Sequence, residues 1–291
     1  MLKNLIQLLK FIWNHPLNRH ARLAAIGRLI RWQIASRLML GPIALPFVNE
    51  TYLFATRGMT GATGNWYCGL HEYEDMSFVL DVLQPGDLFV DVGANIGSYS
   101  ILAGGVGAHV LAFEPIPQSF KVLEQNILLN GLQDKVEAYN IGIGSSSGEL
   151  RFSADQDTVN HVLAEGERVN SAVKVDVLPL DNVLHEKSPV LLKIDVEGYE
   201  SEVLTGAAMV LAHPQLLAVI VELNGSGKRY GQDDDQLHDL LQSKGFQSFQ
   251  YDPQERKLVS LRGARNSTSN TLYLRHLDKI EKRIASREFV H

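Results

Sequence analysis

The stretch DLFVDVGANIGSYS, residues 87–100, decides the fold because an apolar run passes into a glycine-bearing turn and then into a helical pattern. A second apolar run, HVLAFEP at 109–115, follows one short helical segment later. Apolar strands that alternate with helices need crossover connections, which produce a parallel sheet covered by helices on both faces. These two runs therefore predict the first two strands of a doubly wound α/β sheet.

The same alternation continues along the chain and predicts a mostly parallel, seven-stranded sheet. The remaining strands are expected at 136–144, 190–198, 216–224, 246–252 and 270–275. Helices are expected at 71–83, 98–104, 119–130, from about 199 to 211, and at 236–243. Residues 148–178 lack a helical period, and their two β-like runs around a polar loop predict a small β insertion.

The ends of the chain are predicted to lie outside this domain, which we place at 71–276. Amphipathic helices are expected at 2–13 and about 19–40, followed by a glycine-rich loop at 58–69. In that loop Trp66 and Tyr67 could stack on a sugar or anchor the loop. Residues 277–291 are interpreted as a charged tail that forms a solvated helix.

Polar residues follow the first two strands at the edge where a doubly wound sheet binds its ligand. Asp91, Gly93 and Gly97 lie in the first turn, and Glu114 with Pro115 follows the second strand, 21 positions beyond Gly93. An acid at that spacing suits the hydroxyls of an adenosine ribose. The dinucleotide fingerprint requires glycine where this chain has Asn95 and Ser98. The pattern therefore favours a nucleoside cofactor without a phosphate, S-adenosylmethionine, over the nicotinamide-dependent oxidoreductase that remains the alternative enzyme.

The motifs FVDVGANIGSYS, FEP and above all LLKIDVEGYESEVLTGA (191–207) resemble the FkbM-type family of class I S-adenosylmethionine-dependent methyltransferases. The resemblance runs from about residue 75 to 274. It implies a Rossmann-like fold and methyl transfer, usually to a hydroxyl of a sugar, a polyketide or a related secondary metabolite, so that the partner is a small-molecule or glycan acceptor. Matched by position, the resemblance assigns a cofactor loop to Asp91, Gly93, Ala94, Asn95 and Gly97, and the ribose acid to Glu114. It assigns the adenine segment to Asn140, Ile141 and Gly142, and it places Asp195 beside the methyl group.

The fourth strand carries the catalytic candidates. Lys193, Asp195 and Glu197 alternate along an apolar run and are predicted to share one face. Buried charges are costly unless they pair or meet a polar ligand, so the group is either a structural ion pair or part of the site. A methyltransferase needs a base for its acceptor, and Asp195, Glu197 and His161 are the candidates.

Other roles remain open at the sequence level. Asp195 with Glu222 or Asn224 could hold one hard cation through oxygen ligands. His71, beside the glycine-rich loop, is a candidate ligand contact. Glu200 is expected to stabilise the first turn of the helix that follows the strand.

Charge is divided unevenly along the chain. The net charge is −6, but residues 1–49 hold seven Lys and Arg and no acid, which leaves 20 bases against 33 acids in the remainder. An acidic body excludes broad nucleic-acid binding. The basic helices either pack on the domain, as a lid or as a dimer arm, or attach peripherally to the inner face of an anionic membrane.

Two further expectations concern the compartment and a third class of function. Cys68 is the only cysteine, and no signal peptide or membrane span is predicted, so we expect a cytoplasmic protein. A non-catalytic scaffold anchored by the basic helices is the third class. The intact Asp91, Gly93, Gly97, Glu114 and Asp195 argue against it.

Overall fold

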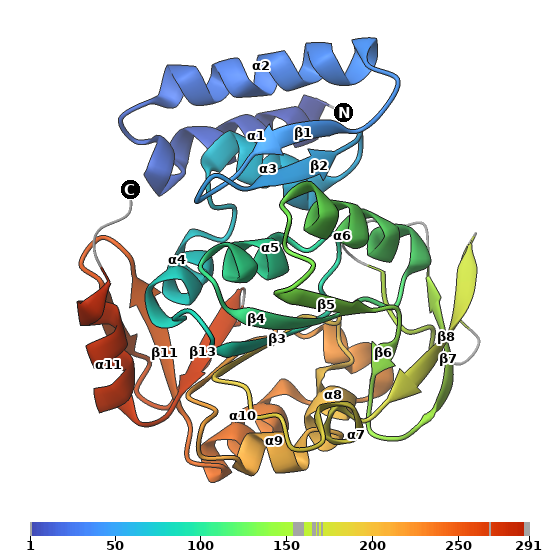
Figure 1. Ribbon diagram of the computed structural model, residues 1–291, viewed down its shortest axis with the longest axis vertical. Coiled ribbons are helices and arrows are strands. Elements are labelled where there is room, and N and C mark those ends of the chain that lie inside the picture. The colour runs from blue at the N-terminus through green and yellow to red at the C-terminus, as the bar shows by residue number, and fades with distance from the viewer. Residues whose placement is uncertain are drawn as a thin grey trace.

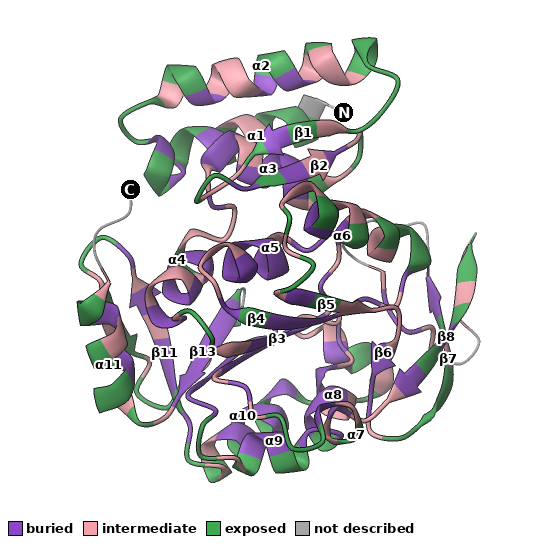
Figure 2. Ribbon diagram, in the orientation of Figure 1, coloured by how far each residue is buried: buried purple, intermediate pink, exposed green. Residues whose placement is uncertain are grey.

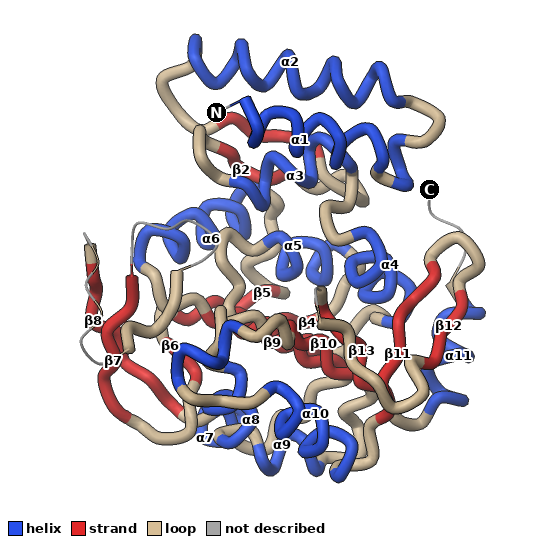
Figure 3. The backbone as a smooth tube through the Cα atoms, turned by 180° about the vertical axis from the view of Figure 1, so that it is seen from behind, coloured by secondary structure: helices blue, strands red, loops and turns tan. Residues whose placement is uncertain are grey.

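The computed structural model describes residues 2–153, 160–164, 167, 169, 171–267 and 269–287. A central sheet lies between two layers of helices, and an N-terminal unit (residues 2–68) is stacked on the outside of one layer (Figure 1). A smaller sheet stands at one side of the molecule. Seen from behind, the central strands form one continuous twisted layer (Figure 3).

The central sheet has the strand order β12-β11-β13-β10-β9-β3-β4-β5. Five neighbouring strands from β10 to β5 run parallel, whereas β13 is antiparallel to both β10 and β11. The strand bounds are β3 (Leu88–Val92), β4 (His109–Phe113), β5 (Val136–Tyr139), β9 (Leu191–Ile194), β10 (Ala218–Glu222), β11 (Gln247–Asp252), β12 (Lys257–Ser260) and β13 (Asn270–Leu274).

Alternate residues of the buried strands face opposite helical layers, as a period of two requires. Phe89 packs with one core cluster and Val90 with the other. The first layer contains α4 (Tyr73–Val82), α5 (Ser98–Gly105), α6 (Pro117–Leu129) and α11 (Leu277–Ser286). The second contains α7 (Leu180–Leu184), α8 (Glu200–Thr205), α9 (Ala208–Ala212) and α10 (Asp234–Ser243), and a 3₁₀ turn, η3 (Ser226–Tyr230), precedes α10. Figure 2 shows that burial is continuous through the sheet between these layers.

All seven predicted strands are present, which confirms the doubly wound α/β fold, but two details of the prediction were wrong. An eighth strand, β12, pairs with β11 at the sheet edge. The third predicted strand does not reach residue 144, because the chain leaves the central sheet after Tyr139. Its last part, β6 (Gly142–Ile143), pairs with a different sheet.

The predicted insertion forms a three-stranded sheet with β6. Its long strands are β7 (Gly148–Ser153) and β8 (Ala172–Leu178), which pair antiparallel over their length. The polar loop predicted between them falls largely outside the described residues. Phe152 of β7 bridges to Val162, so the part of this loop that is described folds back on the insertion.

The N-terminal unit differs from the prediction in its second half. The two predicted helices are α1 (Leu2–Asn14) and α2 (Arg22–Leu38), joined by the 3₁₀ turn η1 (Pro16–Asn18). An unpredicted hairpin of β1 (Ile43–Pro46) and β2 (Tyr52–Ala55) follows. The segment expected to be a glycine-rich loop is a helix, α3 (Thr60–Cys68), most of which is buried. Burial among its neighbours stabilises this helix despite its two glycines, whose intrinsic helix propensity is low.

Side chains of α6 attach the hairpin to the rest of the protein. The amide oxygens of Asn130 and Asn126 accept the backbone N–H groups of Tyr52 and Phe54, both at 2.7 Å. The Asn126 amide nitrogen donates to the carbonyl of Ile96 at 2.8 Å. One buried asparagine therefore connects the N-terminal unit to the turn after β3.

The C-terminal helix is not merely solvated, as the sequence led us to expect. In α11 the side chains of Ile280 and Ile284 are buried in the core that includes α4. Arg283 pairs with Asp87 and donates to the carbonyl of Val82. The helix is part of the folded domain, at least over residues 277–286.

The substitution Ile280→Ala tests this packing. It removes a fully buried side chain and should lower the free energy of unfolding by about 2 to 5 kcal/mol, measured by urea denaturation. The neighbouring Lys279→Ala, on the exposed side of the same helix, should change it by less than about 0.5 kcal/mol. Equal, small effects of both variants would show that α11 does not contribute to the core.

Candidate active site

A cavity of about 230 Å³ lies at the carboxyl ends of β3, β9 and β10, below α3. It brings together most of the predicted site residues from distant parts of the sequence: His71, Asp91, Gly93, Ala94, Asn95, Lys193, Asp195, Glu197 and Glu222. Five carboxyl groups line it, from Glu72, Asp91, Asp195, Glu197 and Glu222, with one ammonium group, from Lys193. The cavity is therefore strongly electronegative and suited to a cationic ligand.

Lys193 and Asp91 are neighbours across the parallel pair of β9 and β3, and both are buried. The Lys193 ammonium donates to Asp195 Oδ2 at 2.8 Å and lies 4.7 Å from the centre of the Tyr99 ring. Burial alone would lower the pKa of Lys193, but the nearby carboxylates of Asp195 and Asp91 outweigh that effect and raise it. Lys193 is therefore charged, and it cannot act as a base near neutral pH.

Asp91 retains one unused acceptor inside the cavity. Its Oδ2 accepts a hydrogen bond from Ser100 at 2.7 Å, whereas its Oδ1 is buried with no partner among the described residues. Burial raises the pKa of Asp91, partly offset by Lys193. A buried carboxylate oxygen without a donor is costly, so a donor from a ligand would be favourable there.

The chain turns sharply where β9 ends, and this changes the prediction for the fourth-strand motif. The strand stops at Ile194, so Asp195 and Glu197 lie in the following turn and not on the strand itself. Glu197 has a positive φ of 53°, which is uncommon for a residue with a side chain. Buried Glu200 accepts the N–H groups of Val196 and Gly198, so it stabilises this turn.

The side chains of Asp195, Glu197 and Glu222, here called the carboxylate cluster, offer oxygens within 4.8 Å of one another. Burial and the neighbouring negative charges raise the pKa of both Glu197 and Glu222 to about 7. Two of the three predicted cation ligands, Asp195 and Glu222, thus lie together with Glu197. The third, Asn224, accepts the N–H of Ser226 through its Oδ1 at 2.9 Å.

The turn after β3, residues 93–97, here called the cofactor loop, packs against the turn after β9. Gly93 has φ 82°, and a Cβ there would overlap the carbonyl oxygen of Asp195. Glycine at this position therefore allows two backbone segments to approach, in addition to any ligand. Gly97, also at positive φ, is the N-cap of α5 and lies against Leu123.

Glu114 follows β4, as predicted, and its carboxyl group holds the backbone around it. Its two oxygens accept the N–H groups of Asn95 and Ile116, both at 2.8 Å. Burial raises its pKa to about 7, although these hydrogen bonds oppose the shift. Glu114 and Pro115 line a small cavity of about 50 Å³ that shares Gly93, Asn95, Asp195 and Glu197 with the larger one. The two cavities therefore lie next to each other at the cofactor loop.

The predicted adenine segment lies further from these cavities. The side-chain amide of Asn140 donates to the carbonyls of Glu114 and Pro115, at 2.8 and 3.0 Å. Ile141 lines a separate cavity beside Tyr139, and Gly142 begins β6. Asn140 therefore holds the backbone of Glu114 and Pro115 and does not line either cavity.

His161 is buried in the insertion and does not itself line either of the two cavities. Its Nε2 lies 2.8 Å from Glu167 Oε1 and its Nδ1 lies 3.4 Å from the Ser153 hydroxyl. The preceding residue, Asn160, lines the smaller cavity. The geometry therefore places the carboxylate cluster, and not His161, beside the cofactor loop.

Sequence reasoning missed the contribution of the N-terminal unit to the site. The cavity of about 230 Å³ is also lined by Thr60, Gly61 and Asn65 of α3, and by Glu72 just before α4. Asn65 accepts the N–H of His71 at 2.7 Å and thereby fixes the junction of the two helices. The aromatic pair in α3 does not line either site cavity: Trp66 donates to the carbonyl of Arg28, and Tyr67 is buried. This arrangement supports the interpretation of Trp66 and Tyr67 as anchors.

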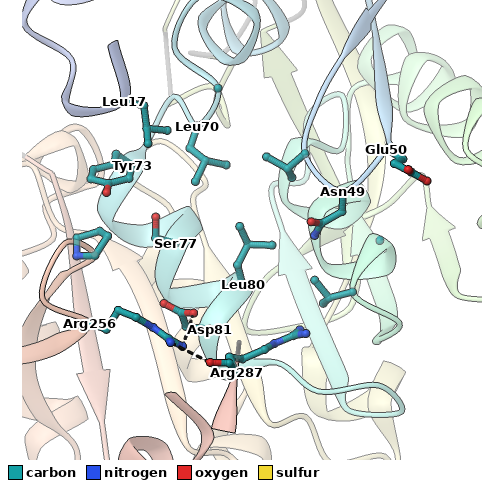
Figure 4. Close-up of a pocket in the computed structure, with 15 residues that line it drawn as sticks. Leu17, Asn49, Glu50, Leu70, Tyr73, Ser77, Leu80, Asp81, Arg256 and Arg287 are labelled. Carbon is teal, nitrogen blue, oxygen red and sulfur yellow. Dashed lines mark hydrogen bonds and ion pairs between the residues drawn. The ribbon is translucent and has the colours of Figure 1, made fainter. Parts of the chain in front are cut away.

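A larger cavity of about 650 Å³ lies on the other side of α4 (Figure 4). Apolar residues such as Leu17, Leu70 and Leu80 surround it, and the ion pair of Arg256 with Asp81 closes one side. It contains none of the predicted site residues and no group with a shifted pKa near 7. We therefore take the two smaller, polar cavities as the candidate active site.

Comparison with known proteins identifies the class. The strand order is that of a doubly wound, Rossmann-like sheet. The model of the methyltransferase FkbM domain matches residues 91–248. The chain belongs to the FkbM methyltransferase family, and it is an enzyme of the methyltransferase class.

Three relatives show the range of this similarity. Hexuronic acid methyltransferase AglP of Haloferax volcanii is 31% identical over 205 residues, which cover 68% of this chain and 82% of AglP. Methyltransferase sdnD of Sordaria araneosa is 33% identical, over 60% of this chain and 79% of sdnD. The 31-O-demethyl-FK506 methyltransferase FkbM of Streptomyces tacrolimicus is 26% identical, over 56% and 74%.

Among solved structures, methyltransferase FkbM from Methylobacillus flagellatus aligns with a TM-score of 0.44 at 16% identity. The match covers 66% of this chain and 44% of that one, so this chain spans less than half of it.

The substitution Gly93→Ala tests the contact between the two turns. The new Cβ would displace the carbonyl of Asp195 and with it the carboxylate cluster, so we expect at least about tenfold weaker binding of S-adenosylmethionine by calorimetry. Gly86→Ala is the control, because Gly86 also has positive φ but open space around it. It should cost about 1 kcal/mol of stability and leave that affinity unchanged. Equal affinities of the two variants would contradict the assignment.

Proposed function

We propose that this protein transfers a methyl group from S-adenosylmethionine to a hydroxyl oxygen of a sugar, a glycan or a secondary metabolite. The observation that supports this most directly is the electronegative cavity that joins the cofactor loop to the carboxylate cluster. Two relatives are named for related reactions, one on a hexuronic acid and one at the 31-O position of FK506.

The residues present fit S-adenosylmethionine. The unpartnered Oδ1 of Asp91 would accept a hydrogen bond from the amino group of the methionine portion. Each carboxylate oxygen of Glu114 accepts one backbone N–H and has a further lone pair that could accept a ribose hydroxyl. When bound, this cofactor supplies a sulfonium methyl group that is already activated for in-line transfer. The surrounding carboxylates favour its positive charge.

The charge of the cavity also restricts the acceptor. Five carboxyl groups and a single Lys193, itself paired with Asp195, would repel an acceptor whose reacting group is a carboxylate. A neutral hydroxyl avoids this repulsion and can donate its proton to a carboxylate. We therefore propose ether formation at an alcohol and not ester formation at an acid.

Glu197 is proposed as the general base. Its carboxyl group lines both cavities, and its pKa of about 7 places it near the optimum for proton transfer at neutral pH. The backbone at Glu197 is held at positive φ, a conformation often retained at functional sites. Lys193 would act as a positioning residue that holds Asp195 through its hydrogen bond.

The carboxylate cluster could instead hold a divalent cation. One experiment tests whether activity needs such a cation and whether the protein transfers methyl groups from S-adenosylmethionine. Protein dialysed against EDTA is expected to bind S-adenosylmethionine, and not NAD, by calorimetry. It should also methylate members of a panel of glycans and hydroxylated metabolites, detected by the mass increase of the acceptor. If transfer disappeared after dialysis and Mg²⁺ restored it, the cluster would be a metal site. If the protein bound neither cofactor, both enzymatic functions would be excluded.

The pH dependence tests the base. Because Glu197 must be deprotonated to accept a proton, kcat/KM should rise as the pH passes through about 7. Glu197→Gln should lower kcat by about 100-fold or more and abolish this rise. Glu222→Gln is the control: it removes a negative charge that raises the pKa of Glu197, so the rise should remain but move to lower pH. An unchanged pH profile in Glu197→Gln would exclude Glu197 as the base.

A further inference from the structure

The outward face of α2 carries a row of exposed aliphatic side chains. Leu23, Ile30, Ile34 and Leu38, here called the outer stripe, are 80%, 55%, 55% and 76% exposed. Their spacing of seven, four and four residues keeps them on one side of the helix, over a length of about 22 Å. Met39 and Leu40 extend the exposed apolar surface beyond the end of the helix.

This stripe is not the face that packs on the protein. The N-terminal unit buries Ala25, Leu29 and Trp32, on the opposite side of α2. Figure 2 shows the buried positions of α2 on its lower side, towards α1, and exposed positions above. The helix is therefore apolar on two opposite faces, and the folded chain uses only one of them.

Exposed apolar residues are concentrated in this part of the molecule. Eleven of the fifteen large hydrophobic side chains that are exposed among the described residues lie between residues 5 and 40. Isolated exposed aliphatic residues are ordinary on a protein surface, whereas a contiguous group on one element marks an interaction site.

The charges around the stripe are all of one sign. Arg31 and Arg37 are exposed on α2 beside it, and Lys3, Lys10 and Arg19 are exposed on or near α1. No Asp or Glu occurs before Glu50. An apolar strip flanked only by basic side chains is complementary to a surface that is apolar within and anionic at its boundary.

We propose that the outer stripe of α2 lies in the interfacial region of an anionic lipid membrane, with Arg31 and Arg37 at the phosphate groups. The described part of the chain has no helix long and apolar enough to span a bilayer, and the proposal requires none. Attachment uses an amphipathic helix in the membrane plane. This inference does not depend on the proposed methyl acceptor.

A second copy of the chain fits this face less well than a lipid surface. A symmetric contact between two α2 helices would place both sets of arginines in one interface, with no acid of the first 49 residues to neutralise them. Anionic headgroups supply the missing negative charge. Dimerisation therefore becomes one outcome of the test and not part of the proposal.

Vesicle co-sedimentation of the full-length protein tests the proposal. We expect binding to vesicles that contain about a quarter phosphatidylglycerol, weaker binding at high salt, and little binding to phosphatidylcholine alone. The triple variant Leu23→Ser, Ile30→Ser, Ile34→Ser should bind at least about tenfold more weakly. The double variant Arg31→Gln, Arg37→Gln should bind anionic vesicles more weakly and show a smaller preference for them over phosphatidylcholine.

A matched control separates this surface from general hydrophobicity. The triple variant Leu128→Ser, Met209→Ser, Val259→Ser changes three exposed apolar residues elsewhere and should bind as the unchanged protein does. Calorimetric titration with S-adenosylmethionine should give the same affinity in both triple variants, which verifies that the site remains folded. Absence of binding to anionic vesicles, or equal binding by both triple variants, would overturn the proposal. A dimer in analytical ultracentrifugation that only the stripe variant dissociates would overturn it in favour of a subunit interface.

Discussion

The candidate site depends on one buried ammonium group. Lys193 lies in the middle of the central sheet, across from Asp91 on β3, and its hydrogen bond holds Asp195 at the end of β9. Without it, Asp195 would lose its ion-pair partner and Asp91 the ammonium group near it, and both carboxylates would be harder to keep charged in the cavity. Lys193 neutralises only part of the surrounding negative charge. The same interaction therefore stabilises the fold and leaves the cavity electronegative.

The N-terminal unit is structurally part of this site. Asn126 of α6 binds both the hairpin, at Phe54, and the cofactor loop, at Ile96. Asn65 of α3, which lines the cavity, donates to the hydroxyl of Ser98 at 3.3 Å and accepts the N–H of His71 at 2.7 Å. Through these two buried asparagines the position of residues 2–68 is coupled to the turn after β3 and to the start of α5. Removal of the unit would expose the cavity and remove one of its walls.

Most of the fold could be predicted from the sequence, since each central strand is a short apolar run bounded by turn residues. The missed elements lack such a signal. β12 is a short, largely exposed edge strand, and α3 contains two glycines and is stabilised by burial. In the site, the strand-end residues Asp91, Asp195 and Glu222 follow from topology, because parallel strands bring their carboxyl ends to one edge. Thr60 and Asn65 could not be predicted, since no local pattern states which surface of α3 meets the sheet. For the same reason the sequence could not decide whether Leu23 and Ile30, or Leu29 and Trp32, face inward on α2.

The uneven charge of the chain has a spatial counterpart. The basic residues lie on the two outermost helices, and the acids of the cavity lie below α3, on the far side of α1 (Figure 1). Two helix layers are about 20 Å thick, so an anionic surface in contact with α2 would not touch the carboxylate cluster. Such a surface would also not occupy the place of a cationic ligand in the cavity. The proposed attachment face and the candidate site therefore use different sides of the N-terminal unit, and one small protein has room for both.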